Sequence, residues 1–168
     1  MAYTTIPKVR RDGKIELRDG TGGSPVVLEV AYEEGNFAFD VPVDDQTVIR
    51  DRSIISAVRK GDEQPITGSF SFFFRAFTDA AVGGIRDFIT KTGAYASNIS
   101  SGATGTPFVE HYCIDIVFTV EGTALGDTAD HTATLSRCVC SLSYAEGDPD
   151  TYSLSFTCYG GVAYTGQT

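Results

Sequence analysis

The chain has 168 residues and a formal net charge of −9, from 13 Lys and Arg against 22 Asp and Glu. Its length predicts one domain, residues 1–168, with a single core. The acidity argues against a DNA-binding domain, because binding to phosphate needs clustered cations. No apolar run reaches the roughly 18 residues that would predict a membrane span, so we expect no membrane insertion.

The composition favours an all-β fold. There are 18 Gly, 11 Phe and 8 Tyr but no Trp, which is typical of tight turns between aromatic strands. Segment 1–11 lacks the apolar region of a secretory signal, so we expect a cytoplasmic protein whose four cysteines are thiols. The predicted strands, in chain order, are 14–18, 26–32, 36–41, 47–52, 54–60, 65–77, 108–121, 132–144 and 151–159.

Three of these strands show an alternation with a period of two residues, which places one face in a core and the other near water. The predicted inward residues are Ile66, Gly68, Phe70, Phe72, Phe74 and Ala76; Phe108, Tyr112, Ile114, Ile116, Phe118 and Val120; and Tyr152, Leu154, Phe156 and Cys158. The opposite face of the first strand carries Thr67, Ser69 and Ser71, and that of the second carries His111, Cys113, Asp115 and Thr119. This pattern predicts a two-sheet antiparallel β-sandwich or barrel.

One α-helix is predicted at about 79–92, between the aromatic strand and the middle of the chain. Thr78 stands at the expected N-cap and Gly93 at the position after the C-cap. The apolar side of the helix carries Ala81, Ile85, Phe88 and Ile89. We therefore expect the helix to flank the β structure by docking on it.

No motif predicts catalysis, and we expect neither an enzyme nor a cofactor. His131 lies near Asp127 and Asp130, but the sequence nominates no serine to complete a triad. The acidic turn 146–150 lacks the ligand alternation of a calcium loop, so a solvated turn is the favoured interpretation.

The cysteines raise the question of a metal site. His111, Cys113, Cys138 and Cys140 have an i, i+2 spacing on predicted strands, whereas structural zinc pairs usually converge from a turn. We therefore predict no metal, and we interpret Cys158 as a small core residue. Inter-strand disulfides between the other three cysteines are an alternative that the sequence leaves undecided for oxidising conditions.

The charged segment 40–63 mixes both signs with apolar residues. A solvated hairpin is one interpretation, but apolar groups among opposite charges suit a subunit interface, which we favour. Arg50, Arg52, Arg59 and Lys60 have no obvious partners along their own strands. The candidate contact residues are Asp44, Asp45, Arg50, Asp51, Arg52, Arg59, Lys60, Asp62 and Glu63.

Three segments resemble the tail tube, or major tail, proteins of long-tailed bacteriophages. They are DRSIISAVRKGDEQPITGSF at 51–70, EGTALGDTADHTATL at 121–135 and AEGDPDTYSLSFTCYGGV at 145–162. The order of the predicted strands and helix is similar along most of the chain. The same architecture resembles the tube proteins of type VI secretion systems.

The resemblance implies a structural virion protein, assembled in the host cytoplasm. Six copies would form a ring with a β-lined channel, and stacked rings would form a tail tube that contacts other tail proteins. DNA would pass without specific binding, since a negative wall repels phosphate. The segment 40–63 would reach the neighbouring ring, and Thr67, Ser69 and Ser71 are candidates for the lumen wall.

Two alternatives stay open. A tail terminator or adaptor ring would share the fold and the symmetry. A monomeric β-sandwich that binds a carbohydrate or another ligand is suggested by the 8 Tyr and the Ser/Thr faces, although Tyr112 and Tyr152 are predicted to face the core.

Overall fold

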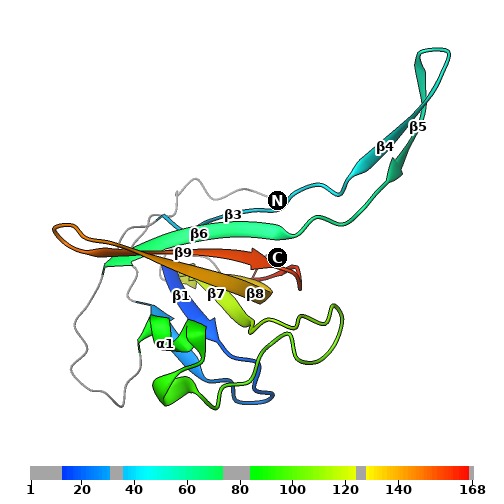
Figure 1. Cartoon of the computed structure of the whole chain (residues 1–168). Coiled ribbons are helices and arrows are strands. Elements are labelled where there is room, and N and C mark those ends of the chain that lie inside the picture. The colour runs from blue at the N-terminus through cyan, green and yellow to red at the C-terminus, as the bar shows by residue number, and fades with distance from the viewer. Residues whose placement is uncertain (1–12, 31–35, 74–83, 124–127, 167–168) are drawn as a thin grey trace.

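The computed structural model describes residues 13–30, 36–73, 84–123 and 128–166. Strands dominate these ranges, with one short α-helix and one 3-10 helix (Figure 1). The elements are β1 (Gly13–Arg18), β2 (Val27–Val30), β3 (Ala38–Asp40), β4 (Gln46–Asp51), β5 (Ile54–Lys60), β6 (Ile66–Phe73), α1 (Ile85–Thr90), η2 (Gly93–Tyr95), β7 (Ile114–Val120), β8 (His131–Ala145), β9 (Thr151–Cys158) and β10 (Val162–Thr165).

The strands form one antiparallel sheet of eight and a separate two-stranded hairpin. The order in the main sheet is β2-β1-β7-β8-β9-β6-β3, and β10 pairs with the first half of β8. Strands β4 and β5 pair only with each other. Strand β10 is not among the predicted strands, because a four-residue strand directly after Gly160 and Gly161 shows too little alternation to be recognised in the sequence.

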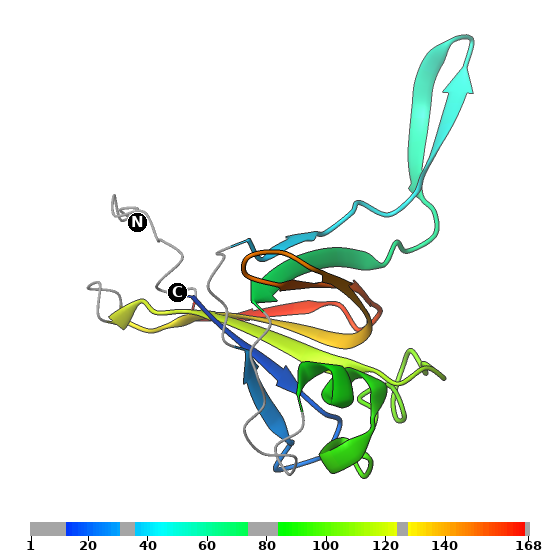
Figure 2. The same ribbon diagram turned by 60° about the vertical axis from the view of Figure 1, so that its left-hand side comes forward.

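The main sheet curls on itself. The Phe37 ring, next to β3, stacks on the Phe118 ring of β7 with centroids 4.7 Å apart. Three strands separate β3 from β7 in the sheet order, so this contact requires the sheet to bend round. The predicted antiparallel β fold with a flanking helix is confirmed, and its two layers are parts of one curled sheet (Figure 2).

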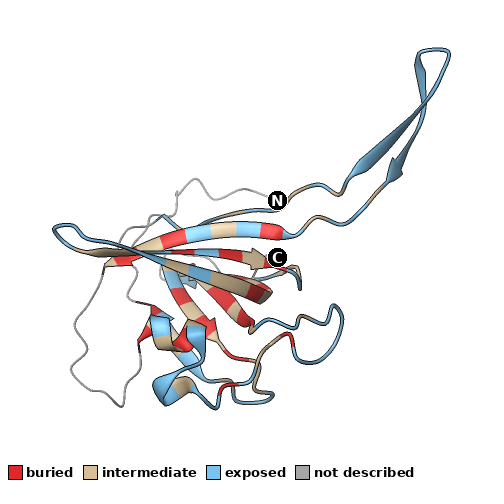
Figure 3. Ribbon diagram, viewed as in Figure 1, coloured by how far each residue is buried: buried red, intermediate tan, exposed pale blue. Residues whose placement is uncertain are grey.

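The alternation of β6 and β9 is confirmed by burial (Figure 3). Inward side chains of these strands and of β1, β7 and β8 form one aromatic and aliphatic core. Gly68 is required within it, because a Cβ there would collide with the Phe156 ring. The buried core includes Ile15, Leu17, Ile66, Phe70, Phe72, Ile114, Ile116, Leu135, Leu154, Phe156 and Cys158, while Phe74 and Ala76 lie outside the described residues.

The alternation predicted for 108–121 is wrong at its start. β7 begins only at Ile114, so the chain before it does not follow the strand period. Phe108 is 69% exposed, whereas Cys113, predicted to face outward, is fully buried. A periodic sequence pattern therefore continued beyond the strand that it marked.

The helix is shorter than predicted. α1 begins at Ile85, after Gly84 in an extended conformation, and ends at Thr90; its C-cap, Lys91, is left-handed with φ 55°. The predicted C-terminal position of Gly93 is wrong, because Gly93 instead opens the 3-10 helix η2. Thr78 and residues 79–83 lie outside the described residues. Phe88 is fully buried and docks the helix on the sheet, as expected.

A buried carboxylate joins β1 to the segment after η2. Asp19 is 2% exposed and accepts hydrogen bonds from the Val26 amide at 2.7 Å, the Ile99 amide at 3.1 Å and the Thr21 hydroxyl at 2.6 Å. Burial by itself raises the pKa of Asp19, but these hydrogen bonds outweigh it and hold the pKa below its ordinary value. The segment after η2 is thereby tied to the sheet.

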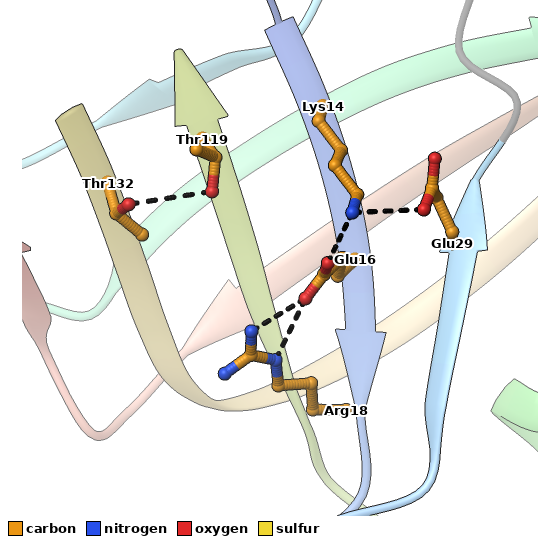
Figure 4. Close-up of polar contacts among 6 residues, drawn as sticks. All are labelled: Lys14, Glu16, Arg18, Glu29, Thr119 and Thr132. Carbon is orange, nitrogen blue, oxygen red and sulfur yellow. Dashed lines mark hydrogen bonds and ion pairs between the residues drawn. The ribbon is translucent and has the colours of Figure 1, made fainter. Parts of the chain in front are cut away.

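The outer face of β1 carries an ion-pair ladder (Figure 4). Glu16 accepts from Lys14 at 2.8 Å and from Arg18 at 2.6 Å, and Lys14 also reaches Glu29 at 3.0 Å. Hydrogen bonds from Lys14, and next from Arg18, lower the pKa of Glu16. On the neighbouring strands Thr119 and Thr132 pair at 3.5 Å, so this side of the sheet is charged and polar.

The core predicts a large effect for Phe72→Ala. Phe72 is 4% exposed and its ring lies against Phe70 and Tyr152. Loss of the ring should lower the free energy of unfolding by about 3–5 kcal/mol in chemical denaturation. Phe108→Ala is the matched control and should change it by less than about 0.5 kcal/mol. Equal effects of the two substitutions would contradict the assignment of the core.

The Asp19 network predicts a pH-dependent contribution to stability. Asp19→Asn should lower the free energy of unfolding at pH 7 by about 1.5–3 kcal/mol, because hydrogen bonds to a charge are lost. Since the folded-state pKa is depressed, this contribution is present above the unfolded pKa of about 3.9 and is lost as the pH falls through the folded pKa. Denaturation of both proteins at pH 7 and in acid should therefore show a difference that shrinks in acid; a constant difference would refute the role of the charge.

Candidate functional site

The β4–β5 hairpin projects away from the sheet (Figures 1 and 2). All six residues of β4 and all seven of β5 are exposed. The two residues of its turn, Arg52 and Ser53, are left-handed with φ 46° and 72°, as in the turns that match the twist of a two-stranded ribbon. The predicted strand 54–60 is confirmed, and the hairpin forms an arm outside the core.

The hairpin is apolar on both of its faces. Val48 pairs with Val58 and Ile49 with Ala57, and successive pairs point to opposite faces. Near the turn, Ile54 is 72% exposed. Isolated two-stranded hairpins are marginally stable in water, and so much exposed aliphatic surface marks an interaction site. This arm is therefore suited to bind another chain.

The charges of the hairpin segment divide between its turn and its base. Arg50, Asp51 and Arg52 stand at the turn, whereas the base carries Asp44, Asp45, Asp62 and Glu63 with Arg59 and Lys60. The expectation that Lys60 lacks a partner is wrong, because its ammonium group lies 2.6 Å from the Asp44 carboxylate. In the described part of the chain, Arg50, Arg52 and Arg59 make no side-chain ion pair.

Strands β6, β9 and β8 share an outer face of hydroxyl groups. Ser71 pairs with Ser153 and Ser153 with Ser143; Ser69, Ser155 and Ser141 form the next row, and Thr67 and Thr157 a third. The hydroxyls of Ser71 and Ser153 lie 3.2 Å apart. None of these positions carries a charge, in contrast to the ladder on β1, and Asp40 beside Thr67 adds the only charge contributed by the adjoining strand β3. The lumen candidates Thr67, Ser69 and Ser71 thus belong to a wider uncharged surface.

The part of the main sheet formed by β8, β9, β6 and β3 has two open edges. Strand β7 pairs with β8 only as far as Cys138, so among the described strands none pairs with that side of residues 139–145. At the other edge, β3 has one partner among the described strands, β6. Open edges offer unpaired amides and carbonyls to a further strand, so both edges are candidates for pairing between copies.

The four cysteine thiols make contacts with backbone groups of the protein. Cys138 and Cys158 are register partners on β8 and β9, and both are buried. Each of the four thiols points at a backbone carbonyl: Cys113 at His111, Cys138 at Leu135, Cys140 at Cys138 and Cys158 at Ser136. Contact with Cys158, and then burial, raise the pKa of Cys138, and burial raises that of Cys140 and of Cys113.

The other titratable residues that the sequence singles out, near His131 and in the turn 146–150, belong to strands and turns of the fold. His131 is the first residue of β8 and not part of a loop, and the Asp130 carboxylate accepts from the Gly122 and Thr123 amides at 3.0 and 3.2 Å. In the turn after β8, Asp150 accepts from the Tyr144 hydroxyl at 2.6 Å and the Gly147 amide at 2.9 Å. Within the described residues, no three His, Cys, Asp or Glu side chains are grouped as a metal site; metal binding and catalysis remain predicted absences. Nor is any helix in those ranges both long and apolar enough to span a membrane.

Comparison with solved structures shows which assemblies contain this fold. A chain from the sheath/tube terminator of the PVC extracellular contractile injection system, in the extended state, matches with a TM-score of 0.60 and 14% identity, covering 97% of this chain and 99% of that one. A chain from the sheath-tube complex of the same system matches at 0.59 and 13%, covering 96% and 93%. The tube-terminating cap of the anti-feeding prophage matches at 0.56 and 14%, covering 98% and 95%.

These likenesses establish a fold related to tail tubes. No protein-family model matches the sequence, and a search of curated proteins gives no significant match. The resemblance to phage tail tube proteins is thus supported at the level of the tube-related fold, while the solved structures belong to contractile injection systems and two of the three are terminators or caps.

The exposed hairpin predicts an assembly defect for the double substitution Arg50→Glu and Arg52→Glu. Both side chains are at the turn, away from the core, so the fold should survive with a change of less than about 0.5 kcal/mol in stability. Like charges would be placed in a contact repeated in every copy, so assembly between copies should be lost. Negative-stain microscopy at low salt checks this, with circular dichroism as the control for folding; assemblies as abundant as those of the wild type would exclude the hairpin from the contact.

Proposed function

We propose that this protein is a structural subunit of a tail-like tube, and that it forms the ring that terminates or caps the tube. The observation that supports this most strongly is the β4–β5 arm, which is fully exposed and apolar on both faces. The solved terminator and cap chains are covered almost from end to end, so the whole chain has a counterpart in such proteins.

The sheet edges explain how copies would join. The open side of β8 at 139–145 in one copy would pair with the open side of β3 in the next, continuing the antiparallel hydrogen bonding. A contact between two different edges is heterologous, and it makes a closed ring when its rotation closes. We propose six copies per ring, by the resemblance to tail tube proteins.

The hydroxyl face would then line the channel. Its three rows of Ser and Thr side chains lack cations, and the whole chain carries −9. A polyanion such as DNA would find no clustered Lys or Arg to release its counterions, so cargo would pass without being held. No catalytic group is needed for this role.

A second candidate is the body of the tube, with rings of this protein stacked on one another in a phage tail. The chain of the PVC sheath-tube complex favours it, because its TM-score is nearly the same as that of the terminator. The physical difference lies in stacking: a tube protein binds its own copies at both ends of the ring, whereas a terminator does so at one end or at neither.

Light scattering after size-exclusion chromatography, followed by negative-stain microscopy, tests the proposal on the purified chain. We expect single or double rings that do not grow with concentration. Long tubes would instead establish the tube-body role. A persistent monomer at every concentration tested would refute both and would leave a monomeric ligand-binding module.

A further inference from the structure

Two of the four cysteines lie directly opposite each other inside the core. Cys138 on β8 and Cys158 on β9 are register partners, and both side chains are buried, with exposed fractions of 0% and 1%. Cys140, by contrast, lies opposite Phe156 in the same register. All four cysteines are free thiols in this structure, so Cys138 and Cys158 are a facing pair of thiols.

The hydrogen bonding of the two strands brings this pair close together. The Tyr159 amide donates to the Arg137 carbonyl at 3.3 Å, and these two residues adjoin the pair. Hydrogen-bonded and non-hydrogen-bonded pairs alternate along an antiparallel ladder, so Cys138 and Cys158 form a non-hydrogen-bonded pair. The Cα atoms of such a pair are about 4.5 Å apart, within the roughly 4.4–6.8 Å that a disulfide spans. A disulfide here therefore requires no large movement of either strand.

The contact between the two thiol groups makes them chemically unequal. Contact with the Cys138 thiol lowers the pKa of Cys158 to about 7 against the opposing effect of burial, and the backbone of Gly160 and Gly161 adds to the lowering. The same contact raises the pKa of Cys138. Because the thiolate is the form of cysteine that attacks an oxidant, Cys158 is the nucleophile of the pair at neutral pH.

A hollow at the end of β9 gives a small oxidant a route to the pair. It has a volume of about 350 Å³, and its lining includes Cys158 and Gly161 together with Pro65 and Pro107. One water molecule takes up about 30 Å³ in the liquid, so the hollow has room for a hydroperoxide. Cys138 is not among the residues of this lining, so an oxidant in the hollow meets Cys158 first.

We propose that Cys138 and Cys158 form an oxidation site, at which a hydroperoxide closes a disulfide between β8 and β9. With hydrogen peroxide, the Cys158 thiolate attacks one oxygen and the O–O bond breaks, which gives a sulfenic acid and a hydroxide that takes up a proton to become water. The Cys138 sulfur then attacks the Cys158 sulfur. The S–S bond forms, the S–O bond breaks, and the hydroxide leaves with the Cys138 proton as a second water. Two thiols are thus oxidised by two electrons, which the peroxide accepts.

The disulfide would join β8 to β9 at the point where β8 parts from β7. Strand β7 pairs with β8 only as far as Cys138, so among the described strands only β9 pairs with residues 139–145. A covalent bond at Cys138 would hold the register of β8 and β9 at the start of this open edge. The inference concerns the single chain and does not depend on the proposed assembly.

Peptide mapping after treatment with hydrogen peroxide tests the site on the whole purified chain. Cleavage after glutamate places Cys113 in peptide 111–121, Cys138 and Cys140 in 122–146, and Cys158 in 147–168. We expect peptides 122–146 and 147–168 to be linked until dithiothreitol separates them, in a protein that stays monomeric on a gel without reductant. A link to 111–121, a link between two chains, or sulfinic and sulfonic acids without any link would overturn the proposal.

Single substitutions show which thiol of peptide 122–146 takes part. Cys138→Ala should abolish the link to peptide 147–168. Cys140→Ala is the matched control, since it removes a neighbouring thiol from the same strand and peptide, and the link should persist in it. Persistence of the link in Cys138→Ala, or its loss in Cys140→Ala alone, would contradict the assignment.

Thermal unfolding gives a second measurement on the unaltered sequence. The oxidised wild type should melt about 5–10 °C above the reduced protein, because the disulfide restricts the unfolded chain, and dithiothreitol should reverse the rise. Cys140→Ala should show the same rise on oxidation, and Cys138→Ala should show none. An oxidised wild type that melts at or below the temperature of the reduced protein would contradict the inference that the bond fits the native register.

Discussion

The structure depends on burying one face of a continuous antiparallel sheet while the other face stays in contact with water. Strands β6 and β9 direct Phe70, Phe72, Leu154 and Phe156 into a shared core, and Leu142 of β8 packs against it. The period of two residues then forces their intervening side chains outward together. Close packing of the inner face thus aligns rows of Ser and Thr on the outer face. The proposed channel lining would therefore be a consequence of how the core packs.

The curl of the sheet closes the core but leaves edges behind. Stacking of Phe37 on Phe118 brings β3 over β7, and the aromatic residues between them fill the interior. Complete closure would pair every strand, yet the second half of β8 and the outer side of β3 stay open. A monomer with such edges is at risk of unspecific pairing, which a closed ring of copies would remove.

The hairpin and the charged ladder show two different uses of surface charge. On β1, Lys14, Glu16 and Arg18 are partnered within the chain, and exposed pairs of this kind contribute little to stability. At the hairpin turn, Arg50 and Arg52 have no such partner in the described structure, and they flank exposed aliphatic groups. Charges that are unpaired beside apolar surface select a partner and set its orientation, which suits assembly more than folding.

Sequence alone determined most of the strands, the inward faces of β6 and β9 and the hairpin, because side-chain alternation and turn residues act over a few positions. Tertiary structure alone decided which distant segments meet: Asp19 with the Ile99 amide, and Cys138 with Cys158. It also decided where β7 and α1 begin. These features depend on strand register and sheet curl, which arise from packing across the whole core and leave no local period in the sequence.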